Sequence, residues 1–205
     1  RDGLDEDQRA AVEAGPEPLL VIAGPGTGKT RVLTYRITHL IERRGVPPAE
    51  ILAVTFTRRA AGELRERLES LLGAERAGAV RVRTFHALGL DILAAEADRV
   101  GRGAGLRVLD DDEALALLAE ATGTRTAEAR RLADAIARAK ERLLGPDEVA
   151  DPALADAYRR YDAALAEAGA VDFDDLIRLA VPLLRDHADV RDAWRARCRW
   201  ILVDE

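Results

Sequence analysis

The chain of 205 residues contains a single cysteine, Cys198. One thiol cannot form an internal disulfide, and a zinc site built from cysteines needs several of them. The sequence therefore excludes a disulfide-stapled fold and a cysteine zinc site. Because free thiols are typical of reducing compartments, we predict a cytoplasmic protein.

Long apolar runs, basic charge and methionine are also scarce. No apolar run approaches the ~18 residues that a membrane helix needs, and no signal-peptide pattern is present. The formal net charge is −6, so any contact with nucleic acid has to be local. Methionine is absent, and the sequence runs from Arg1 to Glu205, directly after an apolar run. We therefore expect a fragment of a longer protein.

The composition and the pattern of apolar residues indicate a globular α/β protein. The sequence is 48% hydrophobic and 33% charged, and its length suits one large domain or one domain with an insertion. Apolar runs alternate with amphipathic stretches, which predicts βαβ units and a parallel sheet. The predicted strands cover 18–23, 51–56, 80–85 and 200–203. The predicted helices of this part cover 4–14, 28–44, 57–72, 86–98, 172–185 and 188–197.

The middle of the sequence has a different character. The flexible segment GRGAG, at residues 101–105, precedes stretches rich in Ala, Leu, Arg and Glu. These stretches predict helices at 111–122, 126–143 and 152–168, with strand-like residues only at 106–109. We therefore predict an inserted helical subdomain at 101–169, while 1–100 and 170–205 form the sheet domain.

A glycine-rich segment, AGPGTGKT, follows the apolar run at 19–22 and opens an amphipathic stretch. Glycines let the backbone wrap around phosphates, and the start of the following helix adds free N–H groups. The lysine can reach the β- and γ-phosphates, and the last threonine can offer its hydroxyl to Mg²⁺. The predicted nucleotide-binding residues are Ala23, Gly24, Pro25, Gly26, Thr27, Gly28, Lys29 and Thr30. The alternative is a glycine-rich turn that binds nothing, since the strict pattern has glycine at the position of Ala23.

Asp204 and Glu205 follow the apolar run at 200–203. An acidic residue at the carboxyl end of a strand next to a phosphate loop can hold Mg²⁺ through its water shell. A glutamate beside it can activate the attacking water as a general base. We predict Asp204 as a metal ligand and Lys29, Asp204 and Glu205 as catalytic residues. The alternative is that both acids are ordinary surface carboxylates.

Gln8 lies on the predicted helix just before the first predicted strand. A glutamine amide can donate to and accept from an adenine edge. A solvated helix residue is the simpler interpretation of Gln8 alone, and only its setting suggests a role in nucleotide binding.

Two similar triplets stand where predicted strands end: Thr55-Phe56-Thr57 and Thr84-Phe85-His86. Ligands of open α/β sheets bind at the carboxyl ends of the strands. Aromatic rings can stack on unpaired bases, while hydroxyls and the basic side chain of Arg58 can hold phosphates. We predict that these residues contact DNA. The alternative is that Phe56 and Phe85 are core aromatics.

Two further clusters have simpler explanations. The acidic run at 172–175 can start a helix, with Asp172 as its cap, which we prefer to a metal site. Tyr158 and Tyr161 lie three residues apart on a predicted helix, a spacing more typical of packing than of nucleic-acid binding.

In this order, the motifs resemble the UvrD/Rep/PcrA family of superfamily-one DNA helicases, and the resemblance spans the sheet domain. LDEDQRAAV is similar to the family's glutamine motif, and AGPGTGKTRVL is similar to its first ATP motif, where alanine at the position of Ala23 is common. AVTFTRRAAGELRERL resembles the next motif, usually TFTNKAA, with Arg58 and Arg59 in place of Asn and Lys. RTFHALGLDIL, VDFDDLIRLA and ILVDE complete the set, while the helical insertion matches only in position and character.

The resemblance implies a RecA-like P-loop NTPase sheet with an inserted all-helical subdomain. It implies that Gln8 reads adenine, that Arg31 supports the nucleotide site, and that ATP and Mg²⁺ are the cofactors. The Phe-bearing strand ends would line a path for single-stranded DNA, and the family translocates 3′ to 5′ and unwinds duplex DNA in replication and repair. Its second motor domain and arginine fingers would lie beyond Glu205, so we expect the 205 residues alone to bind nucleotide but to hydrolyse it slowly and not to unwind DNA.

Three other interpretations remain open. A helicase–nuclease subunit of the RecB/AddA kind shares this motor, and GPGTGKT also occurs in AAA+ ATPases. The chain could also be a non-catalytic fragment or scaffold. We further expect the strand at 201–203 to lie beside the phosphate-loop strand and to leave an exposed sheet edge that allows self-association.

Overall fold

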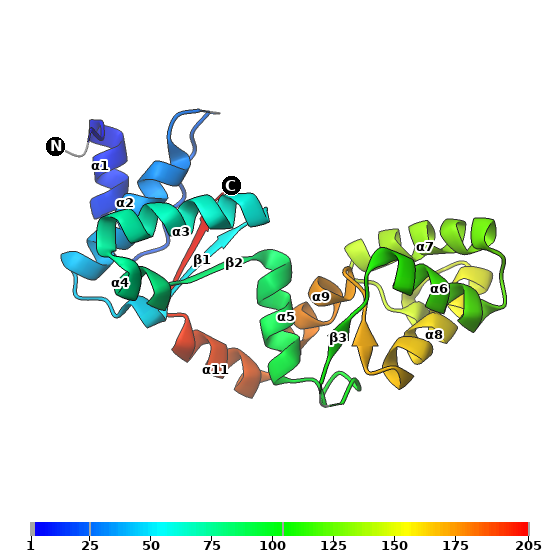
Figure 1. The fold of residues 1–205 in the computed structure, drawn as a ribbon. Coiled ribbons are helices and arrows are strands. Elements are labelled where there is room, and N and C mark those ends of the chain that lie inside the picture. The colour runs from blue at the N-terminus through cyan, green and yellow to red at the C-terminus, as the bar shows by residue number, and fades with distance from the viewer. Residues whose placement is uncertain (1–2, 25, 104, 205) are drawn as a thin grey trace. The chain divides into compact units, whose positions relative to one another are not determined.

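The structure is a computed structural model that describes residues 3–24, 26–103 and 105–204. Its contacts divide the chain into two compact units. The first unit comprises residues 1–85 and 192–205, and the second comprises residues 86–191. Among the described residues, no helix is both long and apolar enough to cross a membrane. Figure 1 shows the elements of both units along the chain.

The first unit is built on a three-stranded parallel sheet with the order β2-β1-β5. Its strands are β1 (Ile51–Thr55), β2 (Arg81–Thr84) and β5 (Trp200–Asp204). Every residue of β1 is buried, as expected for a continuous apolar run in the centre of a parallel sheet. Thr55 is in register with Thr84 on one side and with Asp204 on the other. The three strand ends therefore lie in one row, which confirms the predicted parallel α/β arrangement.

Helices surround this sheet. They are α1 (Glu6–Glu13), α2 (Lys29–Glu42), α3 (Arg58–Leu72) and α4 (Ala74–Ala79), with a short 3₁₀ turn, η1 (Pro48–Glu50), before β1. Residues of α2, α3 and α4 supply the rest of the core of the sheet, while α1 packs on α2. The first turn of α3 is capped by Thr57, whose hydroxyl accepts from the N–H of Ala60 at 3.0 Å. Ile37 and Leu40 of α2 and Leu64 and Leu68 of α3 are fully buried in the core around β1. Figure 1 shows α3 beside β1 and β2.

The predicted strand at 18–23 is wrong, because residues 18–24 have no regular secondary structure. Leu20 and Ile22 are 82% and 89% exposed, while Leu19 and Val21 are 47% and 42% exposed. The predicted pairing of this segment with residues 201–203 is therefore also absent, and within the described residues β5 pairs only with β1. Apolar composition favours an extended chain, but pairing depends on non-local contacts, so composition alone does not add this segment to the edge of β5.

The second unit is mainly helical, and it contains its own core. Its elements are α5 (Phe85–Ala95, whose first residue belongs to the first unit), β3 (Arg107–Val108), α6 (Asp111–Thr122), α7 (Thr126–Glu141), η2 (Pro146–Glu148), α8 (Pro152–Glu167), β4 (Ala170–Val171), α9 (Asp175–Arg178), α10 (Ala180–Asp186) and α11 (Ala188–Arg197, which ends in the first unit). Leu118, Ile136, Tyr158 and Leu165 are buried together at the centre of α6, α7 and α8.

Two details of the second half differ from the sequence prediction. The strand-like residues predicted at 106–109 include β3, but its parallel partner β4, paired through Arg107–Ala170 and Val108–Val171, was not predicted. The predicted helix at 172–185 is divided into α9 and α10. Such short strands and helices are stabilised by contacts that are distant in sequence, so local periodicity does not reveal them.

Candidate nucleotide site and strand-end surface

The glycine-rich segment turns directly into α2. Gly26 and Gly28 have φ values of 75° and 90°, a left-handed conformation that strains any residue with a Cβ. Gly28 is the N-cap of α2, so the first turn of the helix begins at Lys29. The backbone N–H groups of this turn have no helical partner and attract anions. Pro25, which was predicted to belong to the loop, lies outside the described residues.

The side chain of Lys29 folds over this loop. Its Nζ donates to the carbonyl of Ala23 at 3.1 Å and to that of Gly24 at 3.0 Å. The hydroxyl of Thr27 donates to the same Gly24 carbonyl at 2.7 Å. These bonds hold a positive charge beside the exposed N–H groups of the loop and the helix. The arrangement is suited to an anion with several charges.

Thr30 and Asp204 meet, although they are 174 positions apart in the sequence. The Thr30 hydroxyl donates to Oδ2 of Asp204 at 2.9 Å. Thr30 belongs to the first turn of α2, and Asp204 is the last residue of β5. A hydroxyl and a carboxylate are hard oxygen ligands of the kind that Mg²⁺ accepts, usually with several water molecules. The residues therefore fit a magnesium ion next to the phosphate loop. Glu205, predicted as the general base, lies outside the described residues.

A pocket of about 580 Å³ opens beside this pair. Lys29, Thr30 and Asp204 line one part of it, and residues 20–23 line another. The remaining wall comes from Phe56, Thr57 and Ala60, where β1 turns into α3. Lys29, Thr30, Asp204, Phe56 and Thr57, which come from the three predicted groups, thus border a single cavity within the first unit.

Gln8 links α1 to the phosphate loop. Its Nε2 donates to the carbonyl of Thr27 at 3.0 Å. Its Oε1 accepts from the N–H of Asp5 at 3.1 Å, and its own N–H donates to the Asp5 carboxylate at 2.8 Å. The two residues form a capping box at the start of α1. The interpretation of Gln8 as an ordinary solvated residue therefore does not hold, since its side chain is bound at both ends.

Arg31 follows the loop by one residue, on the exposed side of α2. Its guanidinium lies over the ring of Tyr35, with 5.8 Å between the guanidinium carbon and the ring centroid. A Cβ added to Gly3 would stand 2.7 Å from one of its nitrogens. Arg31 therefore extends from α2 to the segment that precedes α1.

Phe56 and Phe85 lie together, as their positions after aligned strands predicted. Their ring centroids are 5.0 Å apart, and the rings meet edge to face at 63°. Phe56 is 59% exposed, so it is not a core aromatic, while Phe85 is half-buried. Thr84 is half-buried at the end of β2, and Arg58 is exposed at the start of α3. This pair presents an aromatic surface at the carboxyl end of the sheet.

Thr55 and Thr57 have internal roles in the same turn. Thr55 is fully buried, and its hydroxyl donates to the carbonyl of Thr57 at 3.2 Å. The hydroxyl of Thr57 caps α3, and it retains its own hydrogen for a further bond. Thr55 therefore shapes the turn rather than exposing a hydroxyl.

In the second unit, His86 stacks on Phe173, a residue that the sequence predictions did not single out. The ring centroids are 3.9 Å apart and the planes differ by 14°. Burial lowers the pKa of His86, which favours a neutral ring. Phe173 is 46% exposed although it is large and apolar. An aromatic residue between aspartates, in VDFDD, is the sequence signal that could have drawn attention to it.

The aspartates around Phe173 belong to a buried ionic network in the second unit. The N–H of Asp175 donates to the Asp172 carboxylate at 3.0 Å, but the N-cap of α9 is Asp174, so the prediction of Asp172 as the cap is wrong because the helix begins later. Lys140 is fully buried and lies 3.0 Å from Asp175, and Arg178 lies 2.7 Å from the same carboxylate. Burial acts to raise the pKa of Asp175, but Lys140 and Arg178 outweigh it and hold that pKa below its ordinary value. The acidic run therefore serves internal structure.

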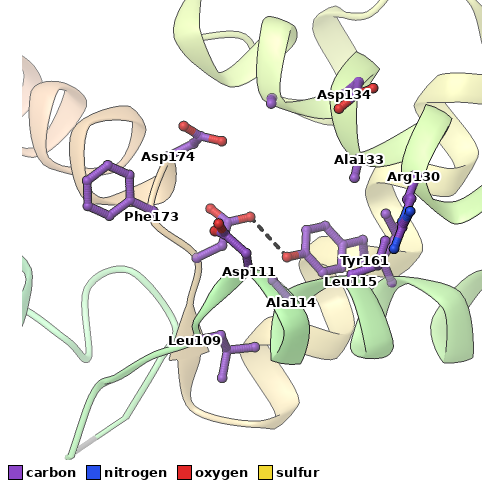
Figure 2. Close-up of a pocket in the computed structure, with 13 residues that line it drawn as sticks. Leu109, Asp111, Ala114, Leu115, Arg130, Ala133, Asp134, Tyr161, Phe173 and Asp174 are labelled. Atoms are coloured by element: carbon purple, nitrogen blue, oxygen red, sulfur yellow. Dashed lines mark hydrogen bonds between the residues drawn. The ribbon is translucent and has the colours of Figure 1, made fainter.

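Figure 2 shows a second pocket, of about 360 Å³, in the second unit. Asp111, Asp134, Asp174 and Arg130 surround it. The dashed line marks the bond that the hydroxyl of Tyr161 donates to Asp172 at 3.0 Å. Burial and neighbouring carboxylates raise the pKa of Asp174. Among the described residues, no group of three or more His, Cys, Asp or Glu side chains is placed to hold a metal ion.

The two tyrosines of α8 pack in the interior, as their spacing predicted. Tyr158 is fully buried and Tyr161 is 3% exposed, both in the core of the second unit. The hydroxyl of Tyr158 donates to the carbonyl of Leu144 at 3.0 Å.

Comparison with known proteins gives the relationship of the chain as a whole. The sequence pattern of the UvrD/REP helicase N-terminal domain matches residues 4–205. The ATP-dependent DNA helicase Rep of Escherichia coli K12 is 40% identical over 213 residues, which cover 98% of this chain and 32% of Rep. The ATP-dependent DNA helicase UvrD1 of Mycobacterium tuberculosis H37Rv is 38% identical over 221 residues, which cover 100% of this chain and 28% of UvrD1.

The ATP-dependent DNA helicase PcrA of Bacillus subtilis 168 is 34% identical over 215 residues, which cover 99% of this chain and 29% of PcrA. This chain therefore spans about 30% of the length of the curated relatives that it matches.

Proposed function

This chain belongs to the UvrD/REP helicase N-terminal domain family, and from that premise we propose that it is the ATP-binding motor domain of an ATP-dependent DNA helicase. The observation that carries the proposal is the hydrogen bond between Thr30 and Asp204. It joins the end of the phosphate loop to the end of β5, so the two halves of a nucleotide site come together. The names of the relatives, all ATP-dependent DNA helicases, agree with this chemistry.

Each residue of the site has a distinct part in the proposed mechanism. The backbone N–H groups of residues 26–30 cradle the phosphates, and Lys29 turns from the loop carbonyls to the β- and γ-phosphates. Thr30 and Asp204 hold Mg²⁺, which neutralises charge on the phosphates when it is bound. Glu205 orients and deprotonates the attacking water. Gln8 reads the adenine edge, and Arg31 supports the nucleotide beside it.

The proposed DNA path runs over the carboxyl end of the sheet. Phe56 offers an exposed face on which a base can stack, and Phe85 supports it from the side. Arg58 and the hydroxyls of Thr57 and Thr84 are placed to contact phosphates, while Thr55 holds the turn in shape. His86 would line the path further along the chain. By family, we propose translocation from 3′ to 5′ along single-stranded DNA, with roles in replication and repair.

We also propose that residues 1–100 and 170–205 form one RecA-like ATP-binding domain and that 101–169 are a helical insertion in it. The order β2-β1-β5 supports an insertion, because the sheet joins strands from both sides of it, although the compact second unit at 86–191 is longer than the proposed insertion. We further propose that these 205 residues bind nucleotide but hydrolyse it slowly and do not unwind DNA. In related phosphoryl-transfer enzymes an arginine supplied to the transition state is worth ~10³–10⁵ in rate. Among the described residues, no arginine lines the pocket beside Lys29, Thr30 and Asp204.

Titration of the chain with fluorescent ADP, with and without Mg²⁺, tests the proposal. We expect Mg²⁺ to tighten binding, and we expect Thr30→Val and Asp204→Asn to lose this gain because each removes one oxygen ligand. Lys29→Ala should weaken binding with or without the metal.

Thr38→Val is the matched control, because the Thr38 hydroxyl donates within α2 to the carbonyl of Thr34 at 3.0 Å and is remote from the loop. The proposed site would be contradicted if the chain did not bind ADP. It would also be contradicted if Mg²⁺ tightened ADP binding as much in Asp204→Asn as in the unchanged protein.

A further inference from the structure

Arg36 lies two turns beyond the phosphate loop on α2, and its guanidinium reaches across to the end of α1. Its Nη1 donates to the carbonyls of Ala11, Val12 and Ala14 at 3.1, 3.1 and 3.0 Å. Its Nη2 donates to the carbonyl of Gly15 at 2.9 Å. Arg36 thus binds four of the carbonyl oxygens at the end of α1, and Arg44 binds a fifth, that of Glu13, at 3.0 Å.

These bonds supply what α1 lacks on its own. The last carbonyls of a helix have no partner inside the helix, and they carry the negative end of its dipole. The last turn of α1 contains no basic residue. Arg36 therefore provides both the donors and the positive charge from the neighbouring helix. Its planar fork can serve carbonyls on both arms, which a lysine cannot do.

Arg44, just beyond the end of α2, adds one bond to the carbonyl of Glu13, while Arg36 makes four such bonds. The apolar contact consists of Leu4, Val12 and Val32, with Ala11 and Tyr35 packed against them. An eight-residue helix is not stable by itself in water, so its position depends on such tertiary contacts. We therefore expect the Arg36 bonds to determine much of where α1 lies.

The position of α1 matters because its first turn carries Gln8. The amide of Gln8 uses one N–H for Thr27 and one lone pair for Asp5. One N–H and one lone pair remain on that amide. They match the adenine edge, which presents a donor and an acceptor side by side. A shift or tilt of α1 would move both groups away from a base whose phosphates lie in the loop.

We propose that Arg36 is a positioning residue for base recognition. By holding the end of α1 on α2, it fixes Gln8 beside the phosphate loop. The base of a nucleotide can then contact Gln8 on α1 while its phosphates bind to the loop before α2. The inference rests on the proposed function, because it takes Gln8 as the residue that reads adenine. Arg36 itself touches no nucleotide, and its effect should appear in base selectivity and not in phosphate binding.

Isothermal titration calorimetry of the full chain with three probes tests this inference: Mg²⁺ with ADP, with GDP and with tripolyphosphate, which has no base. We expect the unchanged protein to prefer ADP over GDP. In Arg36→Ala the affinity for ADP should fall about tenfold, the loss of roughly one hydrogen bond to the base, and that for tripolyphosphate should stay the same. Arg36→Lys should restore part of the preference, because an ammonium can serve some of the carbonyls.

Arg76→Ala is the matched control. The Nε of Arg76 donates to the carbonyl of Leu72 at 2.9 Å, so it serves the end of α3 as Arg36 serves the end of α1. The ratio of ADP to GDP affinity should not change in this variant. If Arg36→Ala does not fold, as judged by circular dichroism, Arg36→Gln takes its place: it keeps a donor but loses the charge and the second arm. A reduced preference for ADP in Arg36→Gln supports the inference.

The outcomes separate this inference from the proposed function. An unchanged ADP preference in the folded Arg36 variant overturns the role of Arg36 while the nucleotide site stands. An equal loss of ADP and tripolyphosphate also overturns it, because the damage then reaches the phosphate loop. An unchanged protein without any preference for ADP overturns both the adenine role of Gln8 and this inference.

Discussion

Phe56 is the exposed aromatic residue on which we expect a nucleic-acid base to stack. Phe56 is 59% exposed, and its ring contacts the ring of Phe85 edge to face. Removing a stacked base from an aromatic ring costs about 1–3 kcal/mol. We therefore expect Phe56→Ala to weaken binding of an oligothymidine about tenfold or more, and Phe56→Trp to retain it. Fluorescence anisotropy of a labelled strand measures this effect.

Leu71→Ala is the control for the loss of an exposed apolar side chain, since Leu71 lies on the far part of α3 and is 39% exposed. Oligothymidine affinity that is the same in Phe56→Ala as in Leu71→Ala would contradict a stacking role for Phe56.

Single residues were predicted best where the local backbone dictates their chemistry. Gly26 and Gly28 have the positive φ values that the loop pattern requires, and the pairing of Thr30 with Asp204 follows from the strand and helix that carry them. The clamp formed by Arg36 could not be predicted. Its acceptors are backbone carbonyls, which every residue possesses, so no side-chain pattern marks them.

At the scale of elements, two glycines inside helices have opposite surroundings. Gly89 of α5 is buried against α9, where an added Cβ would stand 2.2 Å from the carbonyl of Leu176. Nothing lies within 4 Å of the corresponding position at Gly62 of α3. We expect Gly89→Ala to lower the free energy of unfolding of the second unit by about 1–3 kcal/mol through overpacking. Gly62→Ala should raise that of the first unit by about 0.5–1 kcal/mol, because alanine favours the helix.

Denaturant titration of the two variants, followed by circular dichroism, measures both changes. Stabilisation of the second unit by Gly89→Ala would show that α5 can move away from α9 without loss.

The edge of the sheet at β5 leads to a second expectation at this scale. Within the described residues β5 has β1 as its only neighbour, and Ile201 and Val203 are 62% and 51% exposed. Unpaired edges with apolar side chains favour pairing between molecules. We expect the sedimentation coefficient of the chain to rise with concentration, and Ile201→Lys to suppress the rise. A concentration-independent monomer in analytical ultracentrifugation would contradict self-association through this edge.

Elements that repeat a local period were predicted well, and elements that depend on distant partners were not. The helices at 57–72 and 111–122 correspond closely to α3 and α6, whose first turns are capped by the side chains of Thr57 and Asp110. The segment at 18–23 has the composition of a buried strand, yet it stays unpaired. The strand β4 consists of two residues, which are too few to show the alternating pattern of a strand in the sequence. Pairing between strands is a non-local property, which explains both errors.

For the whole molecule, the informative property is that each compact unit has a core of its own. The core of the first unit surrounds β1, and that of the second unit surrounds Tyr158 and Leu118. The helices predicted at 111–122, 126–143 and 152–168 correspond to α6, α7 and α8, although the family resemblance matches this part only in position and character. Motifs are constrained by chemistry, while a helical core can be built from many combinations of apolar residues.

The aromatic residues allow the two units to be followed separately. Both tryptophans, Trp194 and Trp200, belong to the first unit, as does Tyr35, while Tyr158 and Tyr161 belong to the second. A Tyr35→Phe background therefore leaves tyrosine signals from the second unit alone. We expect Asp175→Asn to destabilise the second unit by about 3–5 kcal/mol, because it leaves the buried ammonium of Lys140 without its full charge compensation. Urea denaturation should then show an earlier transition in the near-ultraviolet circular dichroism of tyrosine, while the transition in tryptophan fluorescence keeps its midpoint.

Asp186→Asn, which breaks only the exposed pair with Arg185, should leave both midpoints unchanged. A common shift of both signals in Asp175→Asn would show that the two units unfold as one cooperative structure, against the expectation drawn from their separate cores.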